Sequence, residues 1–237
     1  MRLHDASHGR LITMRHEEKF ICSDRQLFLL EHRLRSVLPP DGHQMGEGYR
    51  IRSLYLDTLD DRLYRESLNG VERRHKYRIR FYNLADDLFR LERKDTVGSL
   101  KQKVSARLSK EEVQAFLNGE GIDPKDTELL NEVHILQNAE GLRPVCVVDY
   151  FRTAFVYPLG NIRITFDRNI SCTHRTMDFF REDALLLPVT PRGRHVLEVK
   201  FDGILPGFVA AALNIGELER ISFSKYAYAR NVIENNG

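Results

Sequence analysis

Several short segments of this chain alternate charged and apolar residues with the two-residue period of an extended strand. In residues 76–81, with the sequence KYRIRF, the lysine and both arginines fall on one face and the three apolar side chains on the other. The same rhythm recurs in 90–94, 101–103 and 198–200. A sheet that places cations on one face of several separate strands is typical of a cavity that binds a polyanion.

The periodicity predicts strands and a few helices, with turn residues between them. The expected strands are 16–22, 49–56, 72–83, 88–95, 98–107, 144–157, 161–168 and 195–201. Ser23 or Asp24 begins a predicted helix that Pro39-Pro40 stops, and a capping box at Ser109 begins another that Gly119 ends. Further helices are expected over 60–68, 127–139, 208–215 and 225–234, whereas 171–192 is expected to be irregular.

About eight strands with hairpin-like connections predict an α+β fold with an antiparallel sheet closed into an eight-stranded β-barrel and helices packed outside. Closure would explain the alternation, because helices would cover the apolar outer face and the inner face would line a wet, charged interior. No internal repeat or linker interrupts the chain. We therefore expect a single domain over 1–237, with its motifs between about 15 and 231.

The chain has 36 Lys+Arg against 34 Asp+Glu, a net charge of +2, so it is not globally basic. This balance argues against a nucleic acid partner bound through overall charge. The first ten residues are polar, unlike a secretion signal, and no apolar run reaches membrane-spanning length. We therefore expect a cytoplasmic protein, and any coupling to a membrane would require a separate partner.

Several common sites are not indicated by the sequence. Cys22, Cys146 and Cys172 are widely spaced, which favours small buried apolar residues over a zinc site or a disulfide. The sequence has neither an HExxH motif nor a P-loop. Side chains, rather than a backbone nest, would therefore have to bind any nucleotide phosphates.

Seven short segments occur in a particular order along the chain. Each segment alone is a weak signal, but the seven in this order are a strong one. They are EEKF (17–20), SLYLDT (53–58), KYRIR (76–80), YFRTAF (150–155), RITFD (163–167), LEVK (197–200) and SKY (224–226). Together they resemble the VTC domain, the polyphosphate polymerase domain of the vacuolar transporter chaperone complex. That family belongs to the triphosphate tunnel metalloenzymes, alongside the CYTH phosphatases.

The resemblance implies an eight-stranded tunnel whose basic walls hold a nucleoside triphosphate or a polyphosphate chain. The residues that would bind phosphates are Lys19, Arg78, Arg80, Lys94, Lys101, Arg152, Arg163 and Lys225. Tyr150 and Ser224 would add hydroxyl contacts, and Glu198 would bind a divalent metal. Lys103 and Lys200 share strand faces with these residues and are further phosphate-binding candidates. Arg78, Arg80, Lys225 and Glu198 would form the catalytic set.

Phosphoryl transfer suits such a set, because it needs positioning and charge neutralisation more than covalent help from the protein. Arginine grips phosphate oxygens in pairs, and lysine acts as a mobile point charge. A carboxylate such as Glu198 among so many cations suggests a shared Mn²⁺ or Mg²⁺ cofactor. Glu17 and Glu92 share faces with Lys19 and Lys94, and would either support the metal or pair with a lysine.

One departure from the CYTH pattern separates the possible activities. CYTH phosphatases open with two glutamates and a lysine at alternate positions, whereas this chain has Arg15, Glu17 and Lys19. The missing carboxylate argues against two-metal hydrolysis, although Glu18 or Glu92 could substitute in space. The first hypothesis is therefore a metal-dependent polymerase that transfers the ATP γ-phosphate to a growing polyphosphate chain.

Two alternative functions remain: a triphosphatase in the same tunnel, and a non-catalytic module that binds polyphosphate or inositol phosphates. Plainer roles also remain open for single residues. Glu198 could be a structural partner of Lys200, Ser224 a helix N-cap, and Tyr150 a packing residue.

Overall fold

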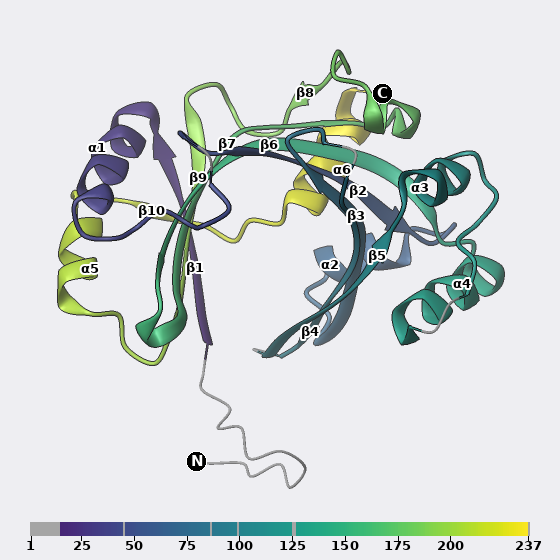
Figure 1. The fold of residues 1–237 in the computed structure, drawn as a ribbon, viewed down its shortest axis with the longest axis horizontal. Helices are drawn as coiled ribbons and strands as arrows, with labels where there is room; N and C mark the ends of the chain where they lie inside the picture. Colours follow the sequence, from purple (N-terminus) through teal and green to yellow (C-terminus); the bar gives the residue numbers. More distant parts are fainter. Residues whose placement is uncertain (1–14, 45, 86, 99, 125–126, 237) are drawn as a thin grey trace, which may run out of the picture. The chain divides into compact units, whose positions relative to one another are not determined.

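The computed structural model describes residues 15–44, 46–85, 87–98, 100–124 and 127–236. Within these ranges it has an α+β fold, with ten strands in an antiparallel sheet and six α-helices (Figure 1). The strands are β1 (Arg15–Ser23), β2 (Tyr49–Asp57), β3 (Arg73–Tyr82), β4 (Phe89–Val97), β5 (Leu100–Leu108), β6 (Arg143–Tyr157), β7 (Ile162–Thr173), β8 (Leu187–Pro188), β9 (Arg194–Asp202) and β10 (Glu219–Arg220). The helices are α1 (Asp24–Arg35), α2 (Arg62–Leu68), α3 (Lys110–Leu117), α4 (Glu128–Glu140), α5 (Gly207–Leu213) and α6 (Lys225–Asn236), with short 3₁₀ helices η1 (Leu159–Asn161) and η2 (Thr176–Phe180).

The sheet is open, so the prediction of a closed eight-stranded barrel is wrong. The strand order is β10-β1-β9-β7-β6-β2-β3-β4-β5, with β8 paired to β7, and it ends at β10 and β5. Alternation shows which face a side chain occupies, but it is identical in open and closed sheets. One end strand, β5, carries Lys101, Lys103 and Arg107, and charged side chains disfavour pairing of an edge with another strand. The other end strand, β10, is only two residues long.

The described residues group into two compact units. Unit 1 takes its described residues from 1–47, 153–167 and 194–222, and unit 2 from 48–152, 168–193 and 223–237. Strands β6 and β7 contribute residues to both units. The single domain expected over 1–237 stays a prediction.

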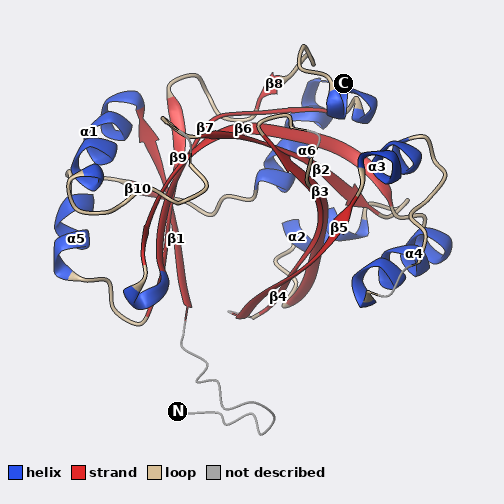
Figure 2. Ribbon diagram, viewed as in Figure 1, coloured by secondary structure: helices blue, strands red, loops and turns tan. Residues whose placement is uncertain are grey.

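In unit 2, helices cover the apolar face of the sheet, as the alternation predicts (Figure 2). Leu54, Ile79 and Leu91 of the sheet are buried in one core with Phe116 of α3 and Val133 of α4. Because successive strand residues point to opposite faces, the charged residues between these apolar ones must lie on the other side of the sheet.

In unit 1, α1 and α5 supply the corresponding cover. Leu30 and Leu34 of α1 and Val209 of α5 are buried with Phe166 of β7 and Leu197 of β9. The other face carries the polar residues that alternate with these apolar ones, namely Glu17, Lys19, Arg163, Thr165, Glu198 and Lys200.

Helix ends follow local sequence signals. Ser23 caps α1 and forms a capping box with Gln26, which resolves the choice between Ser23 and Asp24. The predicted box at Ser109 is present at the start of α3. Gly141 ends α4 with φ 63°, a left-handed conformation that glycine adopts without strain.

The three cysteines are buried, as predicted. Burial raises the pKa of Cys22 to about 12 and that of Cys172 to about 11, and also raises the pKa of Cys146. All three therefore remain protonated thiols near neutral pH and act as small apolar side chains. Among the described helices, none combines the length and the apolar character needed to cross a membrane.

A buried arginine fastens η2 to the sheet. The side chain of Arg52 on β2 is 0% exposed, and its Nε donates to Asp149 Oδ2 at 2.7 Å. Its Nη1 donates to the carbonyl oxygens of Phe179 at 3.2 Å and Arg181 at 2.5 Å. Arg52 thus supplies donors to backbone carbonyls that the irregular segment cannot pair itself.

We expect Arg52→Met to lower the free energy of unfolding by about 2–4 kcal/mol, because buried acceptors lose a charged donor. Urea denaturation would measure this loss. The matched control is Arg50→Met, since Arg50 also donates to Asp149 but its side chain is 31% exposed. That control should lose less than about 1 kcal/mol. If both variants lose the same free energy of unfolding, the burial of Arg52 makes no additional contribution to stability.

Candidate functional site

Unit 2 gathers the charged residues of neighbouring strands on one face of its sheet. Strand register places Arg78 opposite Glu92 and Lys94 opposite Lys103. Directly opposed residues of antiparallel strands lie on the same face. This face, called the cationic face below, includes Lys76, Arg78, Arg80, Glu92, Lys94, Lys101 and Lys103.

Glu92 is the buried carboxylate of the cationic face. It is 2% exposed, and Oε2 accepts from Arg78 Nε at 2.7 Å and lies 3.7 Å from Arg80 Nη1. Lys103 Nζ lies 3.1 Å from Oε1. Burial acts to raise the pKa of Glu92, but Arg78, Arg80 and Lys103 hold it well below its ordinary value of 4.5. Glu92 therefore pairs with cations, and its predicted support of a metal stays a prediction.

The two arginines are held in fixed orientations. Arg78 places Nε and Nη2 on Glu92, each at 2.7 Å, and Nη1 lies 3.4 Å from the Tyr55 hydroxyl. Burial opposes the charge of Arg78, yet Tyr55 and Glu92 outweigh it and raise the pKa. Arg80 donates from Nε to Ser53 Oγ at 3.2 Å. The guanidinium groups of Arg78 and Arg80 are therefore preorganised, and an anion that binds to this face would not have to reorient them.

Tyr150 on β6 contacts three of the predicted phosphate-binding cations. Its hydroxyl accepts from Arg80 Nη2 at 3.2 Å. Lys225 Nζ lies 4.8 Å from the centroid of its ring, and Arg152 Cζ lies 5.3 Å from it. These are cation–π distances, so the ring orders both cations as well as packing in the core. A phosphate contact by the Tyr150 hydroxyl stays a prediction.

Ser224 both begins a helix and contacts the cationic face. Its Oγ accepts from the backbone N–H of Ala227 at 3.3 Å, which confirms the N-cap role at the start of α6. It also accepts from Lys76 Nζ at 2.9 Å. Lys76 was not among the predicted site residues, although it belongs to the same alternating segment as Arg78.

Unit 1 carries a second polar face, made by β1, β9 and β7. Register places Lys19 opposite Glu198, and Lys200 opposite both Glu17 and Arg163. Lys19 Nζ lies 3.3 Å from Glu17 Oε1 and 3.6 Å from Glu198 Oε2, while Lys200 Nζ lies 2.5 Å from Glu198 Oε1. The residues Glu17, Lys19, Glu198 and Lys200 are called the carboxylate–lysine face below.

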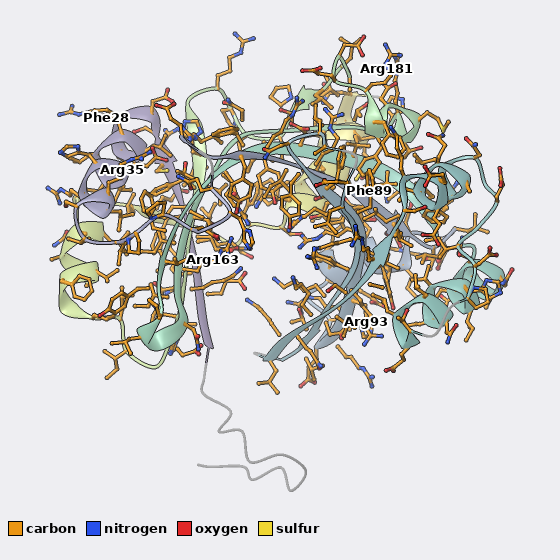
Figure 3. The ribbon with its side chains drawn as sticks, in the orientation of Figure 1. Phe28, Arg35, Phe89, Arg93, Arg163 and Arg181 are labelled. Carbon is orange, nitrogen blue, oxygen red and sulfur yellow. The ribbon has the colours of Figure 1, made fainter. Side chains whose placement is uncertain are left out.

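Arg163 extends this face along β7. In Figure 3 it lies on the side of the strand away from α1 and α5. Its Nη2 is 2.8 Å from Asp41 Oδ2. Arg93 of β4, which Figure 3 also labels, lies on the opposite kind of face in unit 2. It pairs with Glu132 of α4 on the side of the sheet that the helices cover.

The carboxylate–lysine face has the donors that a hard divalent cation requires. Its two carboxylates converge on one ammonium group, that of Lys19. Beside Glu198, the buried Thr165 hydroxyl has no hydrogen-bond partner. In the described ranges, no three or more His, Cys, Asp or Glu residues form a preformed metal group. Mg²⁺ and Mn²⁺ commonly use one or two carboxylates together with waters and phosphate oxygens, and this donor set fits that mode.

The structure sorts the predicted site residues into two groups. In unit 2 these are Arg78, Arg80, Glu92, Lys94, Lys101, Lys103, Tyr150, Arg152, Ser224 and Lys225. In unit 1 these are Glu17, Lys19, Arg163, Glu198 and Lys200. Sequence reasoning missed Lys76, Ser53, Tyr55 and Thr165, because a polar residue in a strand motif shows no partner until the register is known.

The sequence matches the family model described as "VTC domain" over residues 14–233. This chain therefore belongs to the VTC domain family. A comparison with curated proteins finds no match.

Several solved structures resemble this chain at low identity. A candidate adenylate cyclase from Vibrio parahaemolyticus is 11% identical, with a TM-score of 0.49 and coverage of 91% of this chain and 97% of that chain. Another from Bacillus halodurans is 16% identical, with a TM-score of 0.48 and coverage of 85% of each chain. The Mimivirus capping enzyme triphosphatase is 10% identical, with a TM-score of 0.36 and coverage of 78% and 80%. At TM-scores below 0.5 these similarities assign no activity.

Proposed function

We propose that this protein is a metal-dependent polyphosphate polymerase that transfers the γ-phosphate of ATP to a polyphosphate chain and releases ADP. The observation that carries the proposal is the cationic face of unit 2, in a chain that belongs to the VTC domain family. The proposal places the reaction in the cytoplasm, with ATP and polyphosphate rather than nucleic acid as ligands. Any link to a membrane would come from a separate partner.

The local charge supports a polyanionic ligand. At least eight lysines and arginines lie on the cationic face or over the Tyr150 ring, among them Lys76, Arg78, Arg80, Lys94, Lys101, Lys103, Arg152 and Lys225. The whole chain has a net charge of only +2, so this concentration is local. A phosphate chain carries charge at every unit, and a surface with regularly spaced cations complements it.

The reaction balances without an oxidant or a general base. An oxygen of the terminal phosphate of the chain forms a bond to the γ-phosphorus of ATP, and the bond from that phosphorus to the β,γ-bridging oxygen breaks. The bridging oxygen leaves on ADP with its electron pair. The attacking oxygen is already ionised, so no proton has to be removed, and the barrier is lowered by positioning and neutralisation.

Each group of residues has a distinct role in this proposal. Arg78 and Arg80 orient phosphate oxygens from fixed positions, and Lys225, ordered by the Tyr150 ring, neutralises charge on the departing diphosphate. In unit 1, Glu17 and Glu198 would hold the Mn²⁺ or Mg²⁺ ion, whose chemistry when bound is charge neutralisation. Lys19 and Lys200 balance these carboxylates.

Phosphorus NMR of the purified protein with ATP and Mn²⁺ tests the proposal. Internal chain phosphates that appear together with ADP would support a polymerase. ADP with only free phosphate would overturn it in favour of a triphosphatase. Unchanged ATP together with tight polyphosphate binding would overturn it in favour of a binding module.

Lys225→Met should weaken binding of tripolyphosphate by about ten- to a hundredfold, because a charged donor to phosphate is lost while the length of the side chain is kept. Isothermal titration at moderate salt would measure the affinity. Lys110→Met is the matched control, since Lys110 lies on α3 over the Phe180 ring, on the helix side of the sheet. Equal tripolyphosphate affinity in the wild type and in Lys225→Met would show that Lys225 does not contribute to phosphate binding.

A further inference from the structure

Thr165 on β7 has a buried hydroxyl with no hydrogen-bond partner. The residue is 2% exposed, and its Oγ1 is inaccessible to solvent. Removing a hydroxyl from water without giving it a partner is unfavourable, so native proteins seldom keep such a group. Where one persists, an ion, a water or a ligand that belongs at the site is a common reason.

The position of this hydroxyl identifies its neighbours. Register places Thr165 directly opposite Glu198, so the two side chains lie on the same face of the sheet. Arg163, two residues earlier on β7, shares that face. Glu198 has a lysine at each carboxylate oxygen, Lys19 at 3.6 Å and Lys200 at 2.5 Å. The hydroxyl therefore lies beside the carboxylate that best fits a cation, yet it bonds to none of these groups.

We propose that Thr165 is a positioning residue for the divalent cation, and that its Oγ1 accepts a hydrogen bond from a water of the cation held by Glu198. This inference rests on the proposed function. Mg²⁺ and Mn²⁺ usually keep several waters, and a metal-bound water donates hydrogen bonds because its lone pair faces the cation. A threonine hydroxyl can accept such a bond, and groups of this kind orient the coordination shell.

The chemistry predicts an unusual combination of effects for Thr165→Val. Valine has the shape of threonine but replaces the unpaired hydroxyl by a methyl group. Without metal, the urea midpoint of unfolding should stay the same or rise, because nothing in the protein loses a partner. The dissociation constant for Mn²⁺ should increase about tenfold or more, as expected for the loss of a group that orients metal ligands.

Binding of Mn²⁺ to the full chain, followed by electron paramagnetic resonance of the free ion, and urea unfolding in a chelator provide the two measurements. Thr165→Ser is the matched control, because it keeps the hydroxyl and should keep the wild-type Mn²⁺ affinity. Unchanged Mn²⁺ affinity in Thr165→Val would overturn the inference and leave the proposed function standing. A lower urea midpoint without metal would also overturn it, because the hydroxyl would then have a partner within the protein. No Mn²⁺ binding by the wild type would overturn the inference, because no cation would then be held at Glu198, whereas the phosphorus NMR experiment decides the proposed function independently.

Discussion

Replacing Glu198 by glutamine is expected to reduce metal-dependent turnover of ATP at least about a hundredfold, while leaving tripolyphosphate affinity equal or slightly tighter. The amide has nearly the shape of the carboxylate but only one acceptor oxygen and no charge, so it binds a hard cation poorly. Lys19 and Lys200 lose the charge that each now contacts on Glu198. Those ammonium groups then become more available to an anion, which is why polyanion binding should survive.

Two measurements on Glu198→Gln separate these effects: ATP turnover as a function of Mn²⁺, and tripolyphosphate affinity in a chelator. Glu140→Gln is the control, because Glu140 is a carboxylate whose side chain is 39% exposed and which pairs with Arg62 at the end of α4, away from the proposed site residues. It should alter neither quantity. Full Mn²⁺-dependent turnover by Glu198→Gln would instead make Glu198 a structural partner of Lys200, the plainer role that the sequence leaves open.

The faces of the sheet could be predicted from sequence because the period of a strand is a local property. In residues 76–81, every second side chain must share a face, whatever the rest of the chain does. The capping boxes at Ser23 and Ser109 are likewise local, and both are present. Closure of the sheet could not be predicted, because it depends on whether two end strands meet. The cations of β5 favour an exposed edge, but they do not by themselves decide whether β5 and β10 meet.

The partners within the site depend on register, which alternation alone does not provide. Glu92 and Lys94 share a strand face, and the sequence leaves open whether Glu92 supports a metal or pairs with a lysine. Residues two apart on one strand do pair elsewhere in the sheet, as Lys19 does with Glu17 and Lys200 with Glu198, so spacing along the chain alone does not identify the partner of Glu92. Glu92 pairs across the strands, with Arg78 directly opposite it on β3 and with Lys103 diagonal to it on β5. The unpaired hydroxyl of Thr165 could not be found from sequence for the same reason, since it depends on which residues β9 places opposite β7.

Glu92→Gln should lower the free energy of unfolding by about 3–5 kcal/mol at neutral pH, because it removes the buried carboxylate on which Arg78, Arg80 and Lys103 converge. In the wild type these cations hold the pKa of Glu92 below its ordinary value of 4.5. A carboxylate whose pKa is lower in the folded than in the unfolded state contributes its full stability above that ordinary value. The contribution is lost as the pH falls toward the folded-state pKa.

The stability difference between wild type and Glu92→Gln should therefore be largest near neutral pH and shrink steadily below pH 4.5. Urea unfolding across this range would measure it. Tripolyphosphate at neutral pH should restore much of the lost stability, because a bound anion replaces the missing charge and binds the folded state alone. A difference independent of pH would show that Glu92 acts by packing and neutral hydrogen bonds. Failure of tripolyphosphate to stabilise the variant would mean that anions do not reach Arg78 and Arg80, and the cationic face would lose its assigned role.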